Sequence, residues 1–203
     1  LTVTGVQTCA LPISRMLYYT CLGAKMIAEQ LKNEGFARLP QFDHINEVVK
    51  YLNTCQKFPG HVNDRPRPGV YHNAMSDLIQ APYFLDYARS FTDCASEYFG
   101  SEAILWSLNA FYTSSETPYI PSINGVHKDS EANKILTLFV LGYDTEIDGS
   151  QILLSTNGDS FHAFYGKAGT AWLADTSRFH AGFLPKKERL LLWARWASEM
   201  PNA

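Results

Sequence analysis

Hydrophobic residues in the first part of the chain recur at intervals of three and four, which is the period of an amphipathic helix. Residues 16–34 follow this period, and the positions that carry it are Leu17, Cys21, Met26, Ile27 and Leu31. We therefore expect a helix there that ends at Gly35, because glycine is common just after a last helical turn. Residues 36–40 follow as a short predicted strand.

A second helix is predicted after Asp43, whose carboxylate is suited to capping a helix N-terminus. The buried stripe of this helix would consist of Ile45, Val48, Val49 and Leu52. Residues 57–70 contain three prolines and two glycines in polar surroundings, so they predict a loop. A third helix is expected over residues 82–99, with Pro82 in its first turn and Gly100 at its end.

From residue 103 onward the pattern changes to short runs rich in apolar, β-branched or aromatic residues, separated by turn residues. The predicted strands cover residues 104–112, 134–143, 151–155, 170–174 and 189–196. Turns are predicted around the glycines Gly125, Gly149, Gly158 and Gly169. Many short strands with regular punctuation indicate a sandwich or a barrel. With helices first and strands second, the predicted fold class is α+β.

The length of 203 residues suits a single domain. We expect this domain to cover residues 15–203, with a helical part over 15–102 and the main β-core over 103–197. A hydrophobic content of 46% is typical of a globular protein, and a net charge of -3 argues against broad affinity for nucleic acids or anionic membranes. No apolar run approaches the roughly 20 residues that a membrane-spanning helix needs.

Residues 1–14 carry no charge and no clear period, and they closely resemble the conceptual translation of a common sequencing-library adapter. We exclude them from the fold as a non-native segment; a natural apolar leader is the alternative. On the adapter interpretation, the native N-terminus and any targeting signal lie outside this sequence. The cysteines that then remain, Cys21, Cys55 and Cys94, have neither disulfide nor zinc spacing, so we expect reduced thiols in a cytoplasmic protein.

Two candidate metal ligands, His127 and Asp129, follow a glycine turn and precede a predicted strand. On extended backbone, residues i and i+2 share one face, so both side chains can point at one spot. An imidazole and a carboxylate supply two of the three ligands of a 2-His-1-carboxylate triad, which holds Fe(II) and leaves coordination positions open. The motif alone is weak, because this composition produces about 0.6 His-x-acid matches by chance.

His180 is the candidate for the third ligand, and Arg189 follows it by nine residues at the start of an apolar strand. An arginine in that setting is costly unless its charge is paired, and its planar fork suits a carboxylate such as the distal one of 2-oxoglutarate. His162 is the rival third ligand. No arginine follows His162 at a useful distance, so we expect it to be a histidine of the core or its rim.

These residues carry a family resemblance. His127-x-Asp129, the Asp148-Gly149 turn, the run 175–182 and the trailing Arg189 resemble the phytanoyl-CoA dioxygenase group of 2-oxoglutarate oxygenases. The resemblance is patterned over residues 24–197 and is specific over residues 124–195. It implies a double-stranded β-helix core of the jelly-roll or cupin-like type, with N-terminal helices packed on it and iron between its two sheets.

By the same resemblance, His127, Asp129 and His180 would bind Fe(II), and Arg189 would anchor the cosubstrate 2-oxoglutarate. The implied reaction uses O2 to hydroxylate a small organic substrate, acyl, amino-acid-like or a secondary metabolite, with release of succinate and CO2. Related halogenases replace the carboxylate ligand with a small residue, so Asp129 favours hydroxylation.

Members of this group often carry a hydroxyl-bearing residue two places after the second histidine, where this chain has Gly182. The second contact to the cosubstrate is therefore open. The candidates on neighbouring predicted strands are Thr137, Asn109 and Tyr112.

Substrate contacts are predicted in and beside the proline-rich loop, because long loops often form lids over sites built on rigid strands. The candidates there are Arg65, Arg67, Tyr71 and His72, and a solvated loop is the alternative. For Trp172 a core position is favoured, with the pocket wall as the alternative. Arg195 shares a strand face with Arg189, and it is either a substrate contact or the partner of an acidic neighbour.

Two other functions stay open at this point. The spacing of Arg189 and Arg195 resembles nucleic-acid demethylases of the AlkB type, although the chain lacks a basic, aromatic-rich groove. A non-catalytic, cupin-like module that binds a small molecule is the second. We expect a small-molecule substrate, no nucleic-acid partner and no membrane association; the prime substrate and the oligomeric state are not predicted.

Overall fold

The computed structural model describes residues 21–62, 65–119, 124–129, 133–146, 152–156, 160–182 and 184–199. Several features expected from the sequence lie outside these residues. They are the adapter-like segment, the first part of the 16–34 helix, and the turns at Gly149 and Gly158. Within the described residues, no helix is both long and apolar enough to cross a lipid bilayer.

Five helices and ten strands make up the described fold. The helices are α2 (Cys21–Glu34), α3 (Ile45–Leu52), α4 (Met75–Gln80), α5 (Phe84–Arg89) and α6 (Thr92–Phe99). The first five strands are β1 (Phe36–Arg38), β2 (Lys57–Val62), β3 (Arg65–Asn73), β4 (Ile104–Thr113) and β5 (Ile135–Leu141). The remaining strands are β6 (Ile152–Thr156), β7 (Ser160–Phe164), β8 (Ala171–Asp175), β9 (His180–Gly182) and β10 (Arg189–Ala197).

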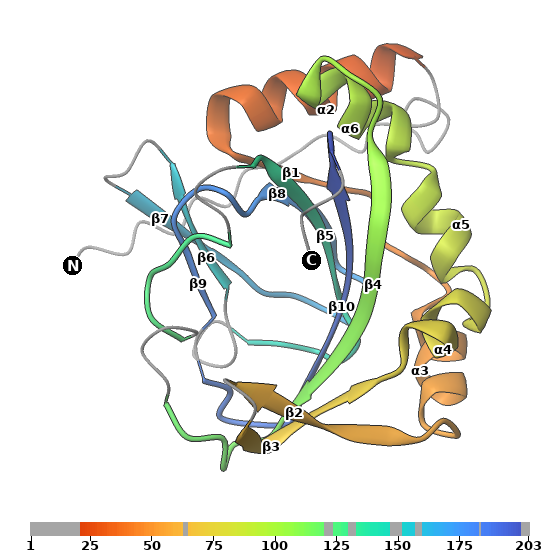
Figure 1. The fold of residues 1–203 in the computed structure, drawn as a ribbon, viewed down its shortest axis with the longest axis vertical. Coiled ribbons are helices and arrows are strands. Elements are labelled where there is room, and N and C mark those ends of the chain that lie inside the picture. The colour runs from red at the N-terminus through yellow and green to blue at the C-terminus, as the bar shows by residue number, and fades with distance from the viewer. Residues whose placement is uncertain are drawn as a thin grey trace.

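The strands form two antiparallel sheets. The large sheet has seven strands in the order β1-β8-β5-β10-β4-β3-β2, and the small sheet has three in the order β7-β6-β9. Figure 1 shows the helices on one side of the large sheet and the small sheet on the other. The predicted α+β class is confirmed, with helices and an antiparallel β-core in separate layers.

The central strand β10 divides its side chains between these two sides, because successive residues of a strand point to opposite faces. Leu190, Leu192, Ala194 and Trp196 are buried in the core that the large sheet forms with the helices. Leu191 lies in a smaller cluster on the opposite face, together with Phe139 and Trp172. The alternation places every second residue of β10 in the space between the two sheets.

The segment predicted to be a loop, residues 57–70, instead contributes the hairpin of β2 and β3, so that prediction is wrong. β2 is the outermost strand of the large sheet. A proline is tolerated there because its missing N–H can lie on the side that has no neighbouring strand. The pairing register also shifts between Pro59 and His61, which makes room for the irregular residues.

The helical region differs from the prediction in its divisions. The single helix expected over residues 82–99 is two helices, α5 and α6, and α4 precedes them. The chain turns at Tyr83, which has a positive φ of 64°, and again at Ser90 and Phe91. Asp43 is not the N-cap of α3, because that position falls on His44. The end of α6 at Gly100 is confirmed, with a φ of 73°.

A buried polar network ties helix α6 to the turn that follows β8. The Tyr98 hydroxyl donates to Asp175 Oδ2 at 2.6 Å, and Arg178 Nε donates to the same oxygen at 3.2 Å. Arg178 also donates to the carbonyl of Lys32 in α2 at 3.1 Å. Burial and the neighbouring Asp175 carboxylate raise the pKa of Tyr98. The network fixes the turn that leads into His180.

We expect Tyr98→Phe to lower the free energy of unfolding by about 1–3 kcal/mol, because Asp175 would lose a buried hydrogen-bond donor that water cannot replace. Urea denaturation followed by circular dichroism measures this change. Tyr119→Phe is the matched control, since Tyr119 is 58% exposed. Equal stabilities of the two variants would contradict the role given to the Tyr98 hydroxyl.

Candidate metal centre

Backbone pairing between two distant segments brings three candidate ligands together. The N–H of His127 donates to the carbonyl of His180, and the N–H of His180 donates back, both at 2.8 Å. The N–H of Asp129 donates to the carbonyl of Thr176 at 2.9 Å. The short run 127–129 is therefore held against the start of β9, and its two ligand side chains share one side with His180.

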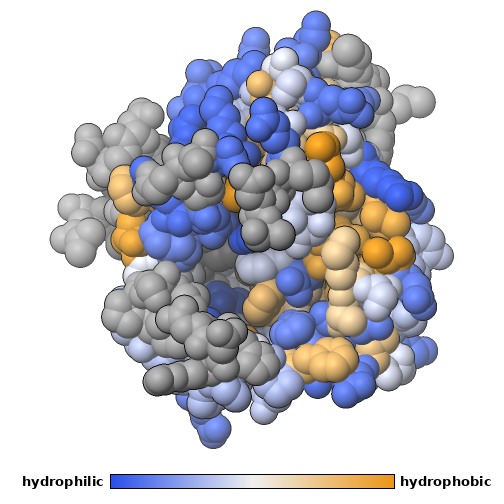
Figure 2. All heavy atoms as spheres, viewed as in Figure 1, coloured by the Kyte–Doolittle hydropathy of each residue, from blue (hydrophilic) through white to orange (hydrophobic). Residues whose placement is uncertain are grey.

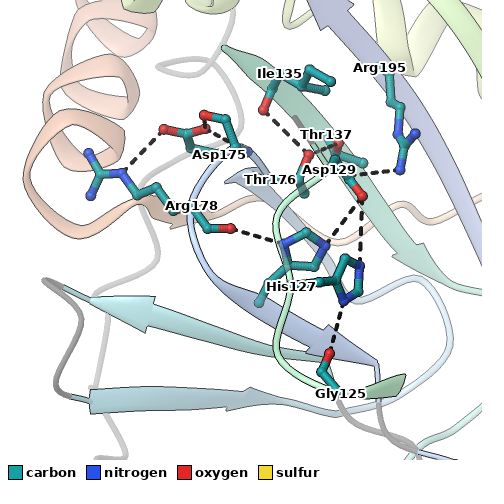
Figure 3. Close-up of polar contacts among 11 residues, drawn as sticks. Gly125, His127, Asp129, Ile135, Thr137, Asp175, Thr176, Arg178 and Arg195 are labelled. Carbon is teal, nitrogen blue, oxygen red and sulfur yellow. Dashed lines mark hydrogen bonds and ion pairs between the residues drawn. The ribbon is translucent and has the colours of Figure 1, made fainter. Parts of the chain in front are cut away.

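One ligand atom from each of His127, Asp129 and His180 lies within 4.8 Å of the other two. Asp129 Oδ1 is 3.8 Å from His127 Nε2 and 3.6 Å from His180 Nε2. Figure 3 shows the Asp129 carboxylate between the His127 imidazole and the Arg195 guanidinium. Within the described residues, this is the one cluster of histidine, cysteine and carboxylate side chains with metal-binding spacing.

Hydrogen bonds on the far side of each ring fix which nitrogen carries the proton. His127 Nδ1 is 2.9 Å from the carbonyl of Gly125, and His180 Nδ1 is 3.1 Å from the carbonyl of Arg178. A carbonyl oxygen only accepts, so both Nδ1 atoms are the donors. In the neutral rings the two Nε2 atoms then present lone pairs to the same spot as Asp129 Oδ1. Two imidazole nitrogens and one carboxylate oxygen converge on one spot, a set of ligand atoms that suits a bound cation.

The second oxygen of Asp129 is occupied by Arg195, whose Nη2 donates to Oδ2 at 2.8 Å. Burial would raise the pKa of the Asp129 carboxyl, but His180, the positive charge of Arg195 and Thr176 together lower it to about 2. Asp129 is therefore ionised at neutral pH, with Oδ2 engaged and Oδ1 directed at the imidazoles. One of the two roles expected of Arg195 was to pair with an acidic neighbour, and that neighbour is Asp129.

Arg195 is itself held in place by a ring. Its guanidinium lies 4.4 Å from the centroid of the Trp193 ring, on the same face of β10. Burial lowers the pKa of Arg195, and the Asp129 carboxylate raises it. Stacking and ion pairing together restrict the guanidinium to one orientation.

The three candidate ligands open onto a cavity of about 370 Å³. Its apolar wall consists of Val70, Phe111, Phe139, Leu191 and Trp193, which come from four strands of the large sheet. Figure 2 shows the molecule hollowed between the two sheets, with hydrophilic residues at the bottom of the hollow. This volume falls in the range of pockets that bind small molecules.

Arg189 lines the same cavity at the start of β10, where it is paired in register with Thr113 of β4. Burial lowers the pKa of Arg189 to about 10, and the positive charge of Arg67 contributes to the decrease. The guanidinium is still charged at neutral pH. The predicted arrangement, in which Arg189 and Arg195 share one strand face, is present.

Asn124 connects two walls of the cavity and was not singled out from the sequence. Arg67 Nη2 donates to Asn124 Oδ1 at 2.8 Å, and Asn124 Nδ2 donates to the carbonyl of Gly182 at 2.9 Å. A Cβ at Gly182 would meet no heavy atom within 4 Å, so the space beside it is open. Asparagine is common in turns, and no spacing in the sequence distinguishes this one.

The three predicted second cosubstrate contacts fall in three different places. Thr137 is fully buried and shares a hydrogen bond of 3.0 Å with Thr176, beneath Asp129. Asn109 is on the cavity face of β4 but is not among the residues that line the cavity. Tyr112 is buried in the core on the helix side, so its prediction as a cosubstrate contact is wrong. Thr113, one residue further on, faces the cavity instead.

The predicted substrate contacts are also divided. Arg67 lines the cavity, whereas the side chain of Arg65 lies outside the described part of the structure. Tyr71 is exposed, and His72 packs beside Phe111 without lining the cavity.

Two further aromatic residues lie away from the cavity. The Trp172 ring stacks on that of Phe164 in the inter-sheet core, with ring centroids 4.9 Å apart, so the favoured core position is confirmed and the pocket-wall alternative is wrong. His162 lies 5.0 Å from the Phe36 ring, outside the ligand cluster, as expected of a rim histidine.

Comparison with known proteins finds likeness in structure only. No protein-family model matches the chain, and no curated protein matches it in sequence. A 2OG-Fe(II) oxygenase family oxidoreductase from Burkholderia pseudomallei is similar with a TM-score of 0.65 at 16% identity, over 87% of this chain and 91% of that one.

Two other solved structures show the same likeness. The epimerase SnoN from nogalamycin biosynthesis, in complex with Fe3+, alpha ketoglutarate and nogalamycin RO, has a TM-score of 0.62 at 15% identity, over 86% of this chain and 83% of its own. A prolyl hydroxylase from Trichoplax adhaerens, in complex with a peptide fragment, has a TM-score of 0.63 at 14% identity, over 86% and 88%. At these identities the likeness is one of fold.

The stabilising effect of the Arg195–Asp129 ion pair can be tested in the metal-free protein. In a double-mutant cycle of Arg195→Gln and Asp129→Asn, we expect a coupling free energy of about 1–3 kcal/mol, because both side chains are largely buried. Urea unfolding of the four proteins measures it. The Lys167–Asp144 pair is the control, with the same kind of contact at 2.7 Å on exposed side chains, and its coupling should be much smaller. Equal couplings would refute the assignment.

Proposed function

We propose that this chain is an Fe(II)- and 2-oxoglutarate-dependent oxygenase in which His127, Asp129 and His180 hold the iron. The observation that supports this most directly is the convergence of two imidazole nitrogens and one carboxylate oxygen at the wall of a cavity. Two imidazoles and one carboxylate form the donor set of non-haem Fe(II) oxygenases and leave the other face of the metal open.

The likeness of fold to 2-oxoglutarate oxygenases supports the same proposal, since the similar SnoN structure holds Fe3+ and alpha ketoglutarate. We further propose that the two sheets form a double-stranded β-helix, and that the chain is of the phytanoyl-CoA dioxygenase type. Residues 15–203 would then be one domain, in which the helices cover the outer face of the large sheet.

Arg189 is the proposed anchor for the distal carboxylate of 2-oxoglutarate. Its guanidinium is a buried positive charge in the cavity that also holds the metal cluster, and its fork can donate two parallel hydrogen bonds to a carboxylate. Thr113 is the proposed second contact, because it is paired in register with Arg189. It also carries the only hydroxyl among the described residues of the cavity wall.

When bound, Fe(II), 2-oxoglutarate and O2 supply an oxidation in which 2-oxoglutarate becomes succinate and CO2 and one C–H bond of the substrate becomes C–O–H. The chain contributes orientation and exclusion of water. Phe111, Phe139 and Trp193 cover the cavity with apolar surface. Arg195 keeps Asp129 ionised and turned toward the imidazoles. The carboxylate ligand favours hydroxylation over halogenation.

The cavity favours a small organic substrate. Its volume of about 370 Å³ lies in the range of pockets that bind small molecules. The nucleic-acid demethylase alternative depended on the spacing of Arg189 and Arg195. The contact of Arg195 with Asp129 accounts for that residue without a nucleic-acid substrate.

Anaerobic addition of Fe(II) and 2-oxoglutarate tests the proposal. We expect a weak visible charge-transfer band, followed on admission of O2 by succinate formation. A protein that binds neither Fe(II) nor 2-oxoglutarate would be the non-catalytic module, and the oxygenase assignment would be withdrawn.

The metal ligands can be tested with a pair of histidine variants. We expect His127→Ala to remove measurable Fe(II) binding and the charge-transfer band, because two ligands no longer define a facial site. His162→Ala is the control and should retain both, since His162 lies outside the cluster. Calorimetric titration with Fe(II) under argon measures the affinity. Loss of Fe(II) binding in His162→Ala, with binding retained in His127→Ala, would overturn the assignment of the ligands.

The anchor can be tested separately from the metal. We expect Arg189→Gln to raise the dissociation constant for 2-oxoglutarate by about 10–100-fold with Fe(II) affinity unchanged, because one charged, bidentate contact is lost. Arg89→Gln removes the same charge from the exposed end of α5 and serves as the control. An unchanged 2-oxoglutarate affinity in Arg189→Gln would show that the anchor lies elsewhere.

A further inference from the structure

The described wall of the cavity carries more positive than negative charge. Among its described wall residues, Arg67, Lys128, Arg189 and Arg195 are cationic, and Asp129 alone is anionic. A divalent metal and a dianionic 2-oxoglutarate cancel each other's charge, so loading the site leaves this excess unchanged. Asp129 contacts Arg195, and the distal carboxylate of 2-oxoglutarate would contact Arg189. Neither carboxylate is assigned to Arg67.

Arg67 is built into the wall of the cavity. Its described hydrogen-bond partner is Asn124, a neutral side chain that is 4% exposed and is itself fixed by the carbonyl of Gly182. The Nε of Arg67 is buried and has no hydrogen-bond partner among the described residues. Asn124 thus orients the guanidinium through one nitrogen, and no described residue accepts a hydrogen bond from Nε. A partly buried guanidinium with a buried, unpartnered N–H favours an anion beside it.

We propose that Arg67 is a second carboxylate-binding residue of this cavity and that its carboxylate belongs to the prime substrate. This inference rests on the proposed oxygenase function and adds the substrate class, a small organic acid. The apolar wall of Val70, Phe111 and Trp193 would cover the carbon skeleton of that acid. Arg67 would fix its acidic end, and with it the carbon that lies nearest the metal cluster.

The cosubstrate is the other source of a carboxylate. Arg67 is near enough to Arg189 for its charge to lower the pKa of Arg189, so two guanidinium groups could contact one anion. A single carboxylate is already matched by the fork of one arginine. If 2-oxoglutarate supplied the carboxylate at Arg67 as well, the loaded cavity would keep its full excess of positive charge. An acidic prime substrate removes part of that excess, and for this reason we assign the carboxylate at Arg67 to it.

The test measures binding rather than turnover. The holoprotein is loaded with Fe(II) under argon and saturated with 2-oxoglutarate, so that Arg189 is occupied. Benzoate, phenylacetate and hexanoate are then titrated by calorimetry, each beside its primary amide. We expect at least one acid to bind and its amide to bind at least about 10-fold more weakly. In Arg67→Gln this preference for the acid should disappear, with 2-oxoglutarate affinity changed less than about 3-fold.

Two variants serve as controls. Arg67→Lys keeps the charge without the planar fork and should retain part of the preference for acids. Arg89→Gln removes one positive charge outside the cavity and should behave as the unaltered protein does. Thermal unfolding of all variants shows whether loss of the Asn124 contact has disturbed the fold.

Each result decides the question. A preference for acids that survives in Arg67→Gln, or its absence from the unaltered protein, overturns the proposal. A loss of 2-oxoglutarate affinity of about 10-fold or more in Arg67→Gln would mean that Arg67 binds the carboxylate of the cosubstrate. That result overturns the assignment to the prime substrate. If the unaltered protein fails to bind Fe(II) and 2-oxoglutarate, the oxygenase function falls. The comparison of acids with amides on the metal-free protein then judges Arg67 alone.

Discussion

The pair of backbone hydrogen bonds between His127 and His180, each 2.8 Å long, is the contact on which the candidate site depends. It joins segments 53 positions apart and sets the two imidazoles with their ring centroids 4.4 Å apart. Both Nδ1 atoms then donate to local carbonyls, so the Nε2 lone pairs face the same point. Because backbone hydrogen bonds hold the two histidines in place, the ligand atoms are preorganised before a metal binds.

Charge organises the rest of the cavity around that contact. Arg195 occupies one oxygen of Asp129 and keeps the carboxyl ionised, which leaves the other oxygen for the imidazoles. Arg189 and Arg67 add positive charge to the same wall, and the neutral Asn124 holds Arg67 without cancelling it. Among the described residues, the wall has one carboxylate and three guanidinium groups, and such a wall is suited to anionic ligands. The proposed cosubstrate and the proposed acidic substrate both follow from this excess.

The pattern of apolar residues predicted the strands that carry a strong apolar run, and it failed where the pairing of strands is irregular. β4, β5, β8 and β10 were expected within a few residues of their observed bounds, because each carries an apolar run of high β-propensity. The hairpin of β2 and β3 was missed because its prolines lie in an outer, irregularly paired part of the sheet. β7 and β9 were also missed.

The sequence by itself determined which side chains could serve as ligands and as an anchor: His127, Asp129, His180 and Arg189 were predicted, and the structure brings them to one cavity. Only the tertiary structure decided which neighbours join them. Tyr112 faces the helices while Thr113 faces the cavity, since adjacent strand residues point in opposite directions and only the packing of the layers says which face is inner. Asn124 and Arg67 meet across 57 positions of chain, and contacts over such a distance leave no local pattern to be found.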